Sequence, residues 1–540
     1  MDADLVTIQE ARDAVRAAAA AQKRFKAATQ DEVDRVVAAM VAAGASEAAR
    51  LGAMAHAETG FGKPESKTQK NLFATRTLAE RMAGMRTAGI VEKSAGGSIW
   101  TVATPMGVVA ALVPSTNPTS TAMYKAIIAA KARCGIVMSP HPRAARCTAE
   151  ALRVVAEAAI AAGAPEGLFA CLGQTEAGVS LAGTDALLEH EQTDVILATG
   201  GGPMVRAAYS KGKPAYGVGS GNVPAYVDRS ANLKKAAADI LTGTSFDWGT
   251  LCSTERSVVA DSPVRTRLLD AFRERGGYVC SEAETAKLRA IITPGGRFNT
   301  GIVGQSPRRI AEMAGFSVPE AAQALIAEVD VVGPEEPLSM ETLSPVLSFY
   351  VADGWEAGCE RCIEILEFGG IGHTLALHAT ADRVIEQFAL RKPSMRIVVN
   401  TVAALGSVGM TTALFPAMTL GPGTLGGSIT SDNVTPMHLV NLKRVAFETA
   451  PLTTEAGEAV ASGASASGPR PARAASGDGS WMDEIEARLV ARAGNRPAGA
   501  ASPAAPAASG GSSPRGGEVT SSVLPLPDDQ IAALIRTHRG

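Results

Sequence analysis

The fold class is clearest in residues 108 to 118, which read Val108-Val109-Ala110-Ala111-Leu112-Val113-Pro114-Ser115-Thr116-Asn117-Pro118. A short continuous apolar run that ends at a proline turn is typical of a strand buried on both faces of a sheet. Similar runs occur at 135–138 and 195–198, and helical patterns at 121–133 and 144–162 separate them. This alternation predicts a doubly wound α/β domain, in which a cofactor binds beyond the carboxyl ends of the parallel strands.

The organisation of the remaining chain follows from its composition. A chain of 540 residues is expected to hold at least two folded domains. Apolar residues at helical spacing predict a helical opening region over residues 5–90, and residues 1–238 are assigned to a dinucleotide-binding domain. A second α/β stretch at 239–410, with strand-like runs such as 346–350, is predicted to be the catalytic domain.

The last part of the chain has a different composition. From 451 to 522, Ala, Ser, Gly and Pro dominate, and such a stretch buries too little apolar area to offset chain entropy. This predicts a disordered linker, in which Trp481 to Ala493 has the spacing of a short amphipathic helix. Residues 523–540 regain an apolar stripe and predict an amphipathic targeting helix that docks on a partner. The alternative is a helix that packs back on its own domain.

Charge and composition exclude several classes of function. The formal net charge of -3 provides no basic field for a phosphate backbone, and no stretch reaches the roughly 18 apolar residues of a membrane helix. The first residues lack the pattern of a secretory signal, so a cytoplasmic protein without nucleic-acid or membrane partners is expected. Seven cysteines are too few for a disulfide scaffold, and the histidines show no metal-ligand spacing, so no metal is expected.

One cysteine stands in a turn-forming stretch, Phe246-Asp247-Trp248-Gly249-Thr250-Leu251-Cys252-Ser253-Thr254-Glu255. A thiolate at Cys252 would add to an aldehyde, and hydride transfer to a nicotinamide would leave a thioester on the enzyme. The oxyanion formed on the way needs donors, for which the Asn117 amide and the Cys252 backbone N–H are candidates. The alternative role for Asn117 is backbone capping. The CxxC pair Cys359 and Cys362 lies in a helical run and is interpreted as buried helix cysteines.

Two glycine clusters are candidates for close approach to a ligand. Ala198-Thr199-Gly200-Gly201-Gly202 lies between a strand-like run and a helical run, where backbone N–H groups can approach a phosphate, although it is not a GxGxxG fingerprint. A denser cluster spans residues 217–224 and suits a backbone that passes close to a ligand or to the nucleophile turn. Gly219, within this cluster, is therefore counted among the candidate cofactor-binding residues.

The order of these motifs resembles that of the CoA-acylating aldehyde dehydrogenases. These include the aldehyde-oxidising half of bifunctional aldehyde-alcohol dehydrogenases and the enzymes of bacterial microcompartments, and the resemblance covers about residues 5–450. Besides the cysteine segment, it is carried by Pro-Ser-Thr-Asn-Pro-Thr-Ser-Thr (114 to 121), Ser-Pro-His-Pro-Arg-Ala (139 to 144), Ala-Thr-Gly-Gly (198 to 201), Gly-Val-Gly-Ser-Gly-Asn (217 to 222) and Gly-Gly-Ile-Gly-His-Thr (369 to 374).

The resemblance implies an aldehyde dehydrogenase-like α/β fold and a role for each matching residue. Cys252 would be the nucleophile and Asn117 the oxyanion donor, with NAD as cofactor and coenzyme A as co-substrate. Dimers or tetramers are implied, with 411–450 as an oligomerisation and return segment in which the region from Leu420 to Phe447 contributes to assembly. The implied cofactor contacts are Ser139, Pro140, His141, Thr199, Gly200, Gly201, Glu341 on the nicotinamide ribose, and His373 facing the cofactor cleft.

One departure from the wider superfamily affects how the thioester would be cleaved. Hydrolytic members carry a glutamate that activates water against the thioester, and Val218 stands at its place in this chain. Valine takes no proton, whereas the thiol of CoA has a pKa around 8.5 and is partly ionised near neutral pH. The resemblance therefore implies an acyl-CoA product. The alternatives are a hydrolytic enzyme that releases a free acid, a reductase of an acyl phosphate, and a non-catalytic scaffold component.

The tail resembles the encapsulation peptides that recruit enzymes into bacterial microcompartments. The shared features are a linker rich in Pro, Ala and Ser and a short terminal amphipathic helix, here at 523–540. Shell proteins would then be partners, and the microcompartment lumen the location. The substrate is expected to be a small aldehyde, with acetaldehyde, propionaldehyde and sulfoacetaldehyde left open.

Overall fold

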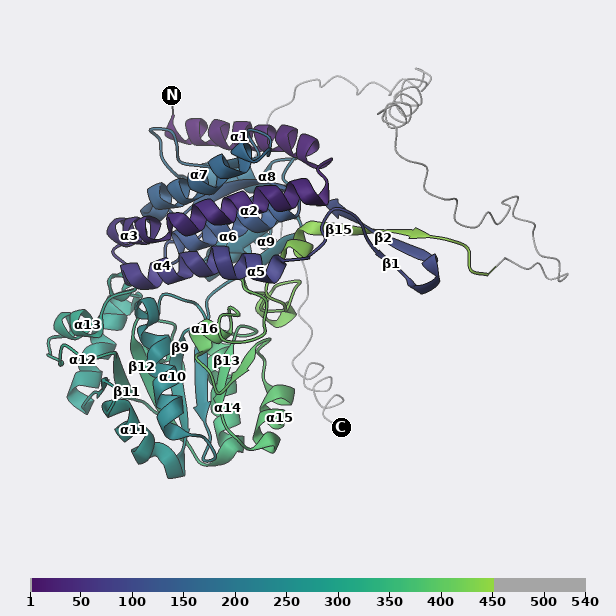
Figure 1. Ribbon diagram of the computed structural model, residues 1–540. Coiled ribbons are helices and arrows are strands. Elements are labelled where there is room, and N and C mark those ends of the chain that lie inside the picture. The colour runs from purple at the N-terminus through teal and green to yellow at the C-terminus, as the bar shows by residue number, and fades with distance from the viewer. Residues whose placement is uncertain (1, 451–540) are drawn as a thin grey trace, which may run out of the picture. The chain divides into compact units, whose positions relative to one another are not determined.

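A computed structural model describes residues 2–450 of the chain (Figure 1). These residues form two parallel sheets covered by helices and a small antiparallel sheet. The predicted linker at 451–522, with its short helix at 481–493, and the predicted targeting helix at 523–540 lie outside the described residues. They remain predictions.

The opening region is helical, as predicted. It contains α1 (Ala3–Phe25), α2 (Gln30–Ser46), α3 (Ala48–Thr59), α4 (Pro64–Leu72) and α5 (Leu78–Met82), with a π-helical turn at Phe73–Thr77. A capping box formed by Thr29 and Glu32 begins α2, and left-handed Gly60 ends α3. Among the described residues, no single helix is long and apolar enough to cross a membrane, although the bent pair α2 and α3 meets that test jointly.

The first sheet has five parallel strands in the order β5-β4-β3-β6-β7. The strands are β3 (Val108–Val113), β4 (Gly135–Pro140), β5 (Phe169–Cys171), β6 (Val195–Thr199) and β7 (Ala215–Val218). Strands β3, β4 and β6 are buried along their whole length, which explains their unbroken apolar runs. The chain runs outward from β3 to β5 and returns on the other side with β6, so the order reverses between β3 and β6. The accompanying helices are α6 (Pro118–Lys131), α7 (Ala145–Ala161), α8 (Leu181–Glu189) and α9 (Gly202–Tyr209).

The second sheet has seven parallel strands in the order β10-β11-β12-β9-β8-β13-β14. These are β8 (Val223–Val227), β9 (Glu255–Asp261), β10 (Gly277–Val279), β11 (Ala324–Glu328), β12 (Val346–Ala352), β13 (Leu375–His378) and β14 (Ile397–Val399). The helices are α10 (Leu233–Ser245), α11 (Arg265–Arg273), α12 (Glu282–Ile292), α13 (Pro307–Ala314), α14 (Gly354–Gly369), α15 (Asp382–Arg391) and α16 (Ala403–Gly406). Cys359 and Cys362 are buried in α14, as predicted.

The change from one sheet to the other occurs between Val218 and Val223. The boundary expected at residue 238 therefore falls inside α10, which follows the first strand of the second sheet. The difference has a simple cause: β8 is buried along its whole length, like β3, β4 and β6, and only a short glycine-rich connection marks the crossing. The assignment of separate roles to the two regions stays a prediction.

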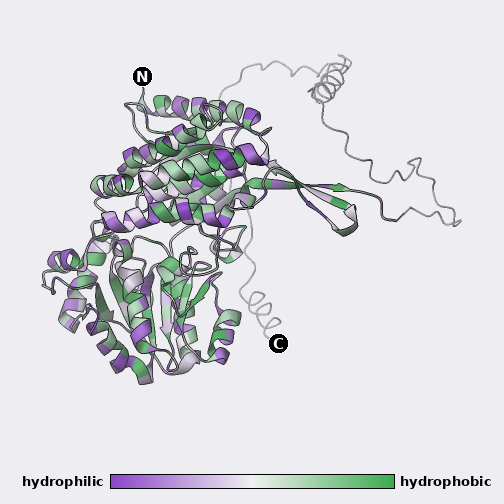
Figure 2. Ribbon diagram, viewed as in Figure 1, coloured by the Kyte–Doolittle hydropathy of each residue, from purple (hydrophilic) through white to green (hydrophobic). Residues whose placement is uncertain are grey.

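A third, antiparallel sheet of β1 (Gly89–Lys93), β2 (Ile99–Pro105) and β15 (Val440–Ala446) extends away from the two parallel sheets (Figure 1). It pairs a segment near residue 100 with the end of the described chain. Hydrophobic residues concentrate on the strands of the parallel sheets, but they also occur on this arm (Figure 2). Exposed apolar side chains on and next to the arm are Ile99, Leu442, Val445 and Phe447.

Candidate active site

One cavity of about 520 Å³ lies where the loops of the two parallel sheets meet. The first sheet contributes loops at the carboxyl ends of β3 and β6, on both sides of the point where its strand order reverses. The second sheet contributes loops at the amino ends of β8, β9 and β12. Of the predicted site residues, eight border this cavity: Asn117, His141, Thr199, Gly200, Gly201, Gly219, Cys252 and Glu341.

The remaining predicted residues lie close by, but not on this cavity. Ser139 and Pro140 border an adjoining cavity of about 210 Å³, which shares His141, Thr199 and the neighbouring glycines with the first. The Ser139 hydroxyl is buried and lies 2.8 Å from the Thr184 hydroxyl, so this side chain is already engaged. His373 is fully buried behind the cavity wall.

The glycines after β6 leave the start of α9 open. Gly201 is the N-cap of α9, and no side chain caps the helix. A Cβ at Gly200 would meet no atom within 4 Å, and one at Gly201 would meet only Pro203 Cδ at 4.0 Å. Backbone N–H groups at a helix N-terminus that faces open space are suited to an anionic phosphate. This end of the site therefore fits a phosphate-bearing dinucleotide.

The backbone that leads to Cys252 is unusual. Asp247 and Trp248 both have φ of 49°, and Gly249 has φ of 73°, so three consecutive residues are left-handed. Each non-glycine residue in this region costs about 1–3 kcal/mol and persists only when its surroundings hold it. Arg256, buried on β9, donates to the carbonyl oxygens of Gly249 and Leu251 in this turn.

Arg256 also ties the nucleophile turn to a second loop. Its Nη1 donates to the Ser344 carbonyl at 3.1 Å, next to the loop that carries Glu341. Burial lowers the pKa of this guanidinium to about 10 while the Glu341 carboxylate opposes that effect. Sequence reasoning missed Arg256, because an arginine near the start of a strand carries no signal of where its guanidinium points.

The Cys252 thiol is protonated at neutral pH in this structure. Burial raises the pKa of Cys252 to about 12, and the Glu341 carboxylate raises it further, whereas Arg396 and Arg256 act in the opposite direction. Burial also raises the pKa of Glu341, whose Oε1 accepts a hydrogen bond from the Gly221 backbone N–H at 3.0 Å. Removal of the thiol proton is therefore a necessary step before Cys252 can attack.

His373 lies beside the Cys252 backbone, separated from it only by a glycine. A Cβ at Gly221 would clash with the Cys252 carbonyl oxygen and would lie 3.1 Å from His373 Cδ2. His373 Nδ1 lies 3.0 Å from the Thr374 hydroxyl, while Nε2 is buried without a hydrogen-bond partner. Burial lowers the pKa of His373 to about 3, so the ring is neutral.

Asn117 does not act as a helix cap. It occupies the N-cap position of α6, but its side chain makes no capping hydrogen bond, so the capping alternative is wrong. Its Nδ2 instead donates to the Thr250 carbonyl at 3.3 Å and to the Thr116 hydroxyl at 3.1 Å. The amide therefore reaches from the first sheet to the turn that carries Cys252.

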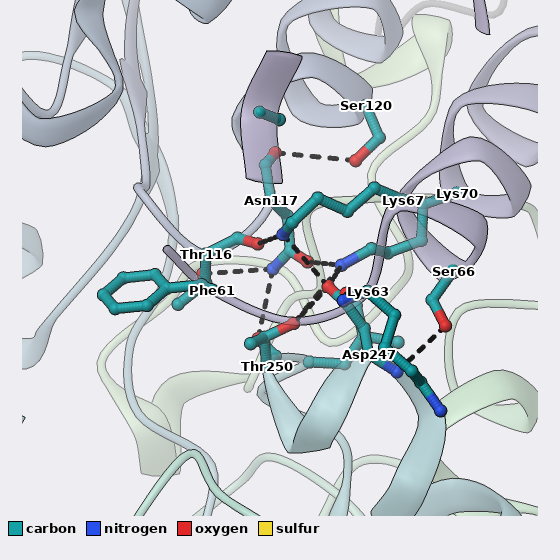
Figure 3. A network of polar contacts seen from close by, with 12 residues as sticks. Phe61, Lys63, Ser66, Lys67, Lys70, Thr116, Asn117, Ser120, Asp247 and Thr250 are labelled. Atoms are coloured by element: carbon teal, nitrogen blue, oxygen red, sulfur yellow. Dashed lines mark hydrogen bonds and ion pairs between the residues drawn. The ribbon is translucent and has the colours of Figure 1, made fainter. Parts of the chain in front are cut away.

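A buried ionic cluster behind Asn117 was also missed by sequence reasoning (Figure 3). It consists of Lys67 and Lys70 from α4 and Asp247 from the nucleophile turn. Two lysines three residues apart in a helix are normally read as a solvent-exposed face, and only the tertiary structure shows that both are buried.

Comparisons with known proteins agree with this architecture. Residues 2–279 match the sequence model of the aldehyde dehydrogenase family. The bifunctional aldehyde-alcohol dehydrogenase AdhE of Escherichia coli (strain K12) is 41% identical over 431 residues, which are 79% of this chain and 48% of that protein. This chain thus spans about half the length of that relative.

Solved structures match over more of their own length. The crystal structure of an acetylating aldehyde dehydrogenase from Geobacillus thermoglucosidasius has a TM-score of 0.82 and 46% identity, covering 84% of this chain and 100% of that one. A propionaldehyde dehydrogenase from the fucose utilisation bacterial microcompartment of Clostridium phytofermentans has a TM-score of 0.73 and 25% identity, covering 81% and 97%.

Proposed function

The chain belongs to the aldehyde dehydrogenase family, and we propose that it oxidises a short-chain aldehyde to an acyl-CoA through a thioester on Cys252. NAD would accept the hydride. The observation that carries this proposal is the composition of the cavity: a thiol from one sheet and a side-chain amide from the other border it, with Val218 where a hydrolytic relative would place a glutamate.

The proposed reaction passes through two covalent intermediates on Cys252, a thiohemiacetal and a thioester. The Cys252 thiol loses its proton and its sulfur bonds to the aldehyde carbon, giving a thiohemiacetal oxyanion that Asn117 Nδ2 and the Cys252 backbone N–H stabilise. When the carbonyl re-forms, the carbon gives up a hydride, which a bound nicotinamide would accept, and the acyl group remains on Cys252 as a thioester. The CoA thiol then displaces Cys252, so the aldehyde is oxidised by two electrons and one proton is released.

The acceptor of the acyl group follows from the groups that surround the thioester. Val218 is buried and offers no base, and Glu341 is the only carboxylate among the residues that line the described cavity. Its Oε1 already accepts a hydrogen bond from the Gly221 backbone N–H. Water would therefore lack the carboxylate base that hydrolytic relatives use, whereas CoA brings its own ionisable thiol.

We expect aldehyde and NAD to give acyl-CoA when CoA is present and almost no free acid when it is absent. Because general-base assistance contributes about 10²- to 10⁴-fold, turnover without CoA should be slower by about 10²-fold or more. The measurement is reduced nicotinamide formation together with chromatography of both products. Equal rates with and without CoA, and free acid as product, would establish the hydrolytic alternative. The Glu341→Gln variant would then show whether Glu341 supplies the base.

We propose that the chain forms a homo-oligomer through its antiparallel arm. Strand β15 pairs with β2 along one edge, and within residues 2–450 no strand pairs with its other edge. Exposed apolar side chains on and next to this strand, including Leu442, Val445 and Phe447, are suited to contact with a second copy. A molar mass of a single chain in sedimentation equilibrium would refute this proposal.

We propose in addition that residues 523–540 recruit the enzyme to the shell of a bacterial microcompartment. The support is the composition of the tail and the origin of one structural relative in such a compartment. Deletion of residues 523–540 should leave the specific activity in solution near that of the full chain and abolish co-purification with shell proteins. Loss of solubility and activity on deletion would show instead that the segment belongs to the enzyme's own core.

A further inference from the structure

The oxyanion donor has a buried ionic support behind it. Figure 3 shows Lys70 and Lys67, both from α4, pointing toward Asp247 and toward the loop that carries Asn117. The two lysine side chains are 2% exposed and the Asp247 side chain is 0% exposed. Burial of an ion costs several kcal/mol, so charged groups kept this deep inside a protein need specific partners.

The contacts of Lys70 fix the orientation of the Asn117 amide. Lys70 Nζ donates to Asn117 Oδ1 at 2.5 Å, to Asp247 Oδ2, and to the Thr250 hydroxyl at 3.3 Å. An ammonium has three N–H donors and accepts nothing, so the amide oxygen must face Lys70. The Nδ2 group then points away from Lys70 and toward the nucleophile turn, where it lies 3.3 Å from the Thr250 carbonyl.

Asp247 connects the same cluster to the left-handed turn. Its Oδ1 accepts from the Lys63 backbone N–H at 2.7 Å, and its Oδ2 accepts from the Thr250 hydroxyl at 2.5 Å and from Lys67 at 3.2 Å. Burial opposes ionisation of Asp247, but Lys70 and Lys67 hold its pKa below the ordinary value. The cluster therefore holds both the Asn117 amide and the turn before Cys252.

The charges in the cluster do not cancel. Two ammonium groups face one carboxylate, so a net positive charge lies behind the Asn117 amide oxygen. Water does not screen a cation buried this deeply. The cation therefore polarises the amide and strengthens its N–H groups as donors to a negative oxygen. Burial lowers the pKa of Lys70 to about 8, while Asp247 opposes that effect, so Lys70 is mostly charged at neutral pH.

We propose that Lys70 is the positioning residue of the oxyanion donor: it orients the Asn117 amide and places positive charge behind it. The proposal rests on the proposed function, in which Asn117 donates to the oxyanion of the Cys252 adduct. Lys67 offers a matched comparison within the same helix. It shares Asp247 but donates to the Thr116 carbonyl at 3.2 Å rather than to Asn117.

A double-mutant cycle with Lys70→Met and Asn117→Ala tests this proposal. In the parent background, Lys70→Met should lower kcat by about 10- to 100-fold, which is part of the 10²- to 10³-fold effect of one oxyanion donor. The KM for the aldehyde should change little, because the interaction is made only in the transition state. In the Asn117→Ala background the same change should cost less than about 3-fold, since the group it positions is absent.

The Lys67→Met variant serves as the control for a merely structural role. It removes the same charge at an equally buried position but no hydrogen bond to Asn117, so its coupling to Asn117→Ala should be weaker than that of Lys70→Met. Lys70→Gln keeps a donor near Asn117 and should recover part of the activity lost in Lys70→Met. If Lys70→Met is unfolded by circular dichroism, the cycle is measured with Lys70→Gln, whose smaller loss should also vanish without Asn117.

The outcomes distinguish the positioning role of Lys70 from the oxyanion role of Asn117 in the proposed function. Multiplicative losses for Lys70 and Asn117 would overturn the positioning role of Lys70 and leave the proposed function standing. Near-parent activity of Asn117→Ala would instead overturn the oxyanion role on which the inference rests. A third outcome is that Lys70→Met and Lys67→Met lower kcat by the same factor, both in the parent and in Asn117→Ala. Both lysines would then serve stability alone.

Discussion

Replacement of Cys252 by alanine should reduce aldehyde-dependent formation of reduced nicotinamide by about 10⁴-fold or more, the scale of loss seen when an enzyme's nucleophile is removed. The physical reason is that hydride leaves readily from a thiohemiacetal and not from a free aldehyde. Cys252 is the only cysteine that borders the described cavity. No neighbouring thiol among the described residues can therefore take its place.

Cys171→Ala is the matched control for this prediction. Cys171 is the other partly exposed cysteine among residues 2–450, but it lies on β5 at the edge of the first sheet, away from the nucleophile turn. Its replacement should leave activity near that of the parent. Intact-protein mass spectrometry with aldehyde and NAD, in the absence of CoA, should show an acyl adduct on the parent and on Cys171→Ala, but not on Cys252→Ala. Activity in Cys252→Ala would contradict the covalent route.

The sequence predicted the parts of the fold that local patterns encode. The apolar run from Val108 to Val113 forms a fully buried strand, as expected of parallel sheets covered on both faces. The glycines at 200 and 201 precede a helix, as expected of a strand-to-helix turn. The position of the sheet change was missed, because residues on both sides of it are equally apolar and no local pattern records which sheet a strand joins.

Site residues could be predicted from the sequence where the residue type and its local position suggest a chemical role. A cysteine in a turn and an asparagine after a buried strand stood out, and both border the cavity. The sequence did not single out Lys70 and Asp247, because each depends on the other as a partner more than a hundred residues away. It did not single out Arg256 either, because the role of Arg256 depends on the direction in which its guanidinium points. Residues that support a site through tertiary contacts leave little trace in a single sequence.

The geometry of the two sheets explains why the supporting residues are needed. The first sheet places its loops at strand carboxyl ends, where a cofactor fits, and the second places Cys252 and Glu341 before its strands. Asn117 and Cys252 therefore come from different sheets, and nothing in either sheet alone fixes the distance between them. Lys70 and Asp247 join the Asn117 loop to the nucleophile turn directly.

Asn117→Ala should lower kcat by about 10²- to 10³-fold, the usual cost of removing one oxyanion donor. The oxyanion of the Cys252 adduct would keep only the backbone N–H as a donor. The variant should also be less stable by about 1.5–3 kcal/mol, because the buried Lys70 ammonium loses an acceptor. Steady-state kinetics and chemical denaturation measure the two effects on the same preparation.

Asn117→Asp separates these two effects, because it changes charge with almost no change in size. A carboxylate would still accept from Lys70, but its second oxygen would face the Thr250 carbonyl, so only part of the stability lost in Asn117→Ala should return. It would offer no N–H to the oxyanion and would repel it, so activity should fall at least as far as in Asn117→Ala. The expected order of stability is therefore the reverse of the order of activity for the two variants. If both quantities fell together in Asn117→Asp, the side chain would be a structural bridge between the sheets and not the oxyanion donor.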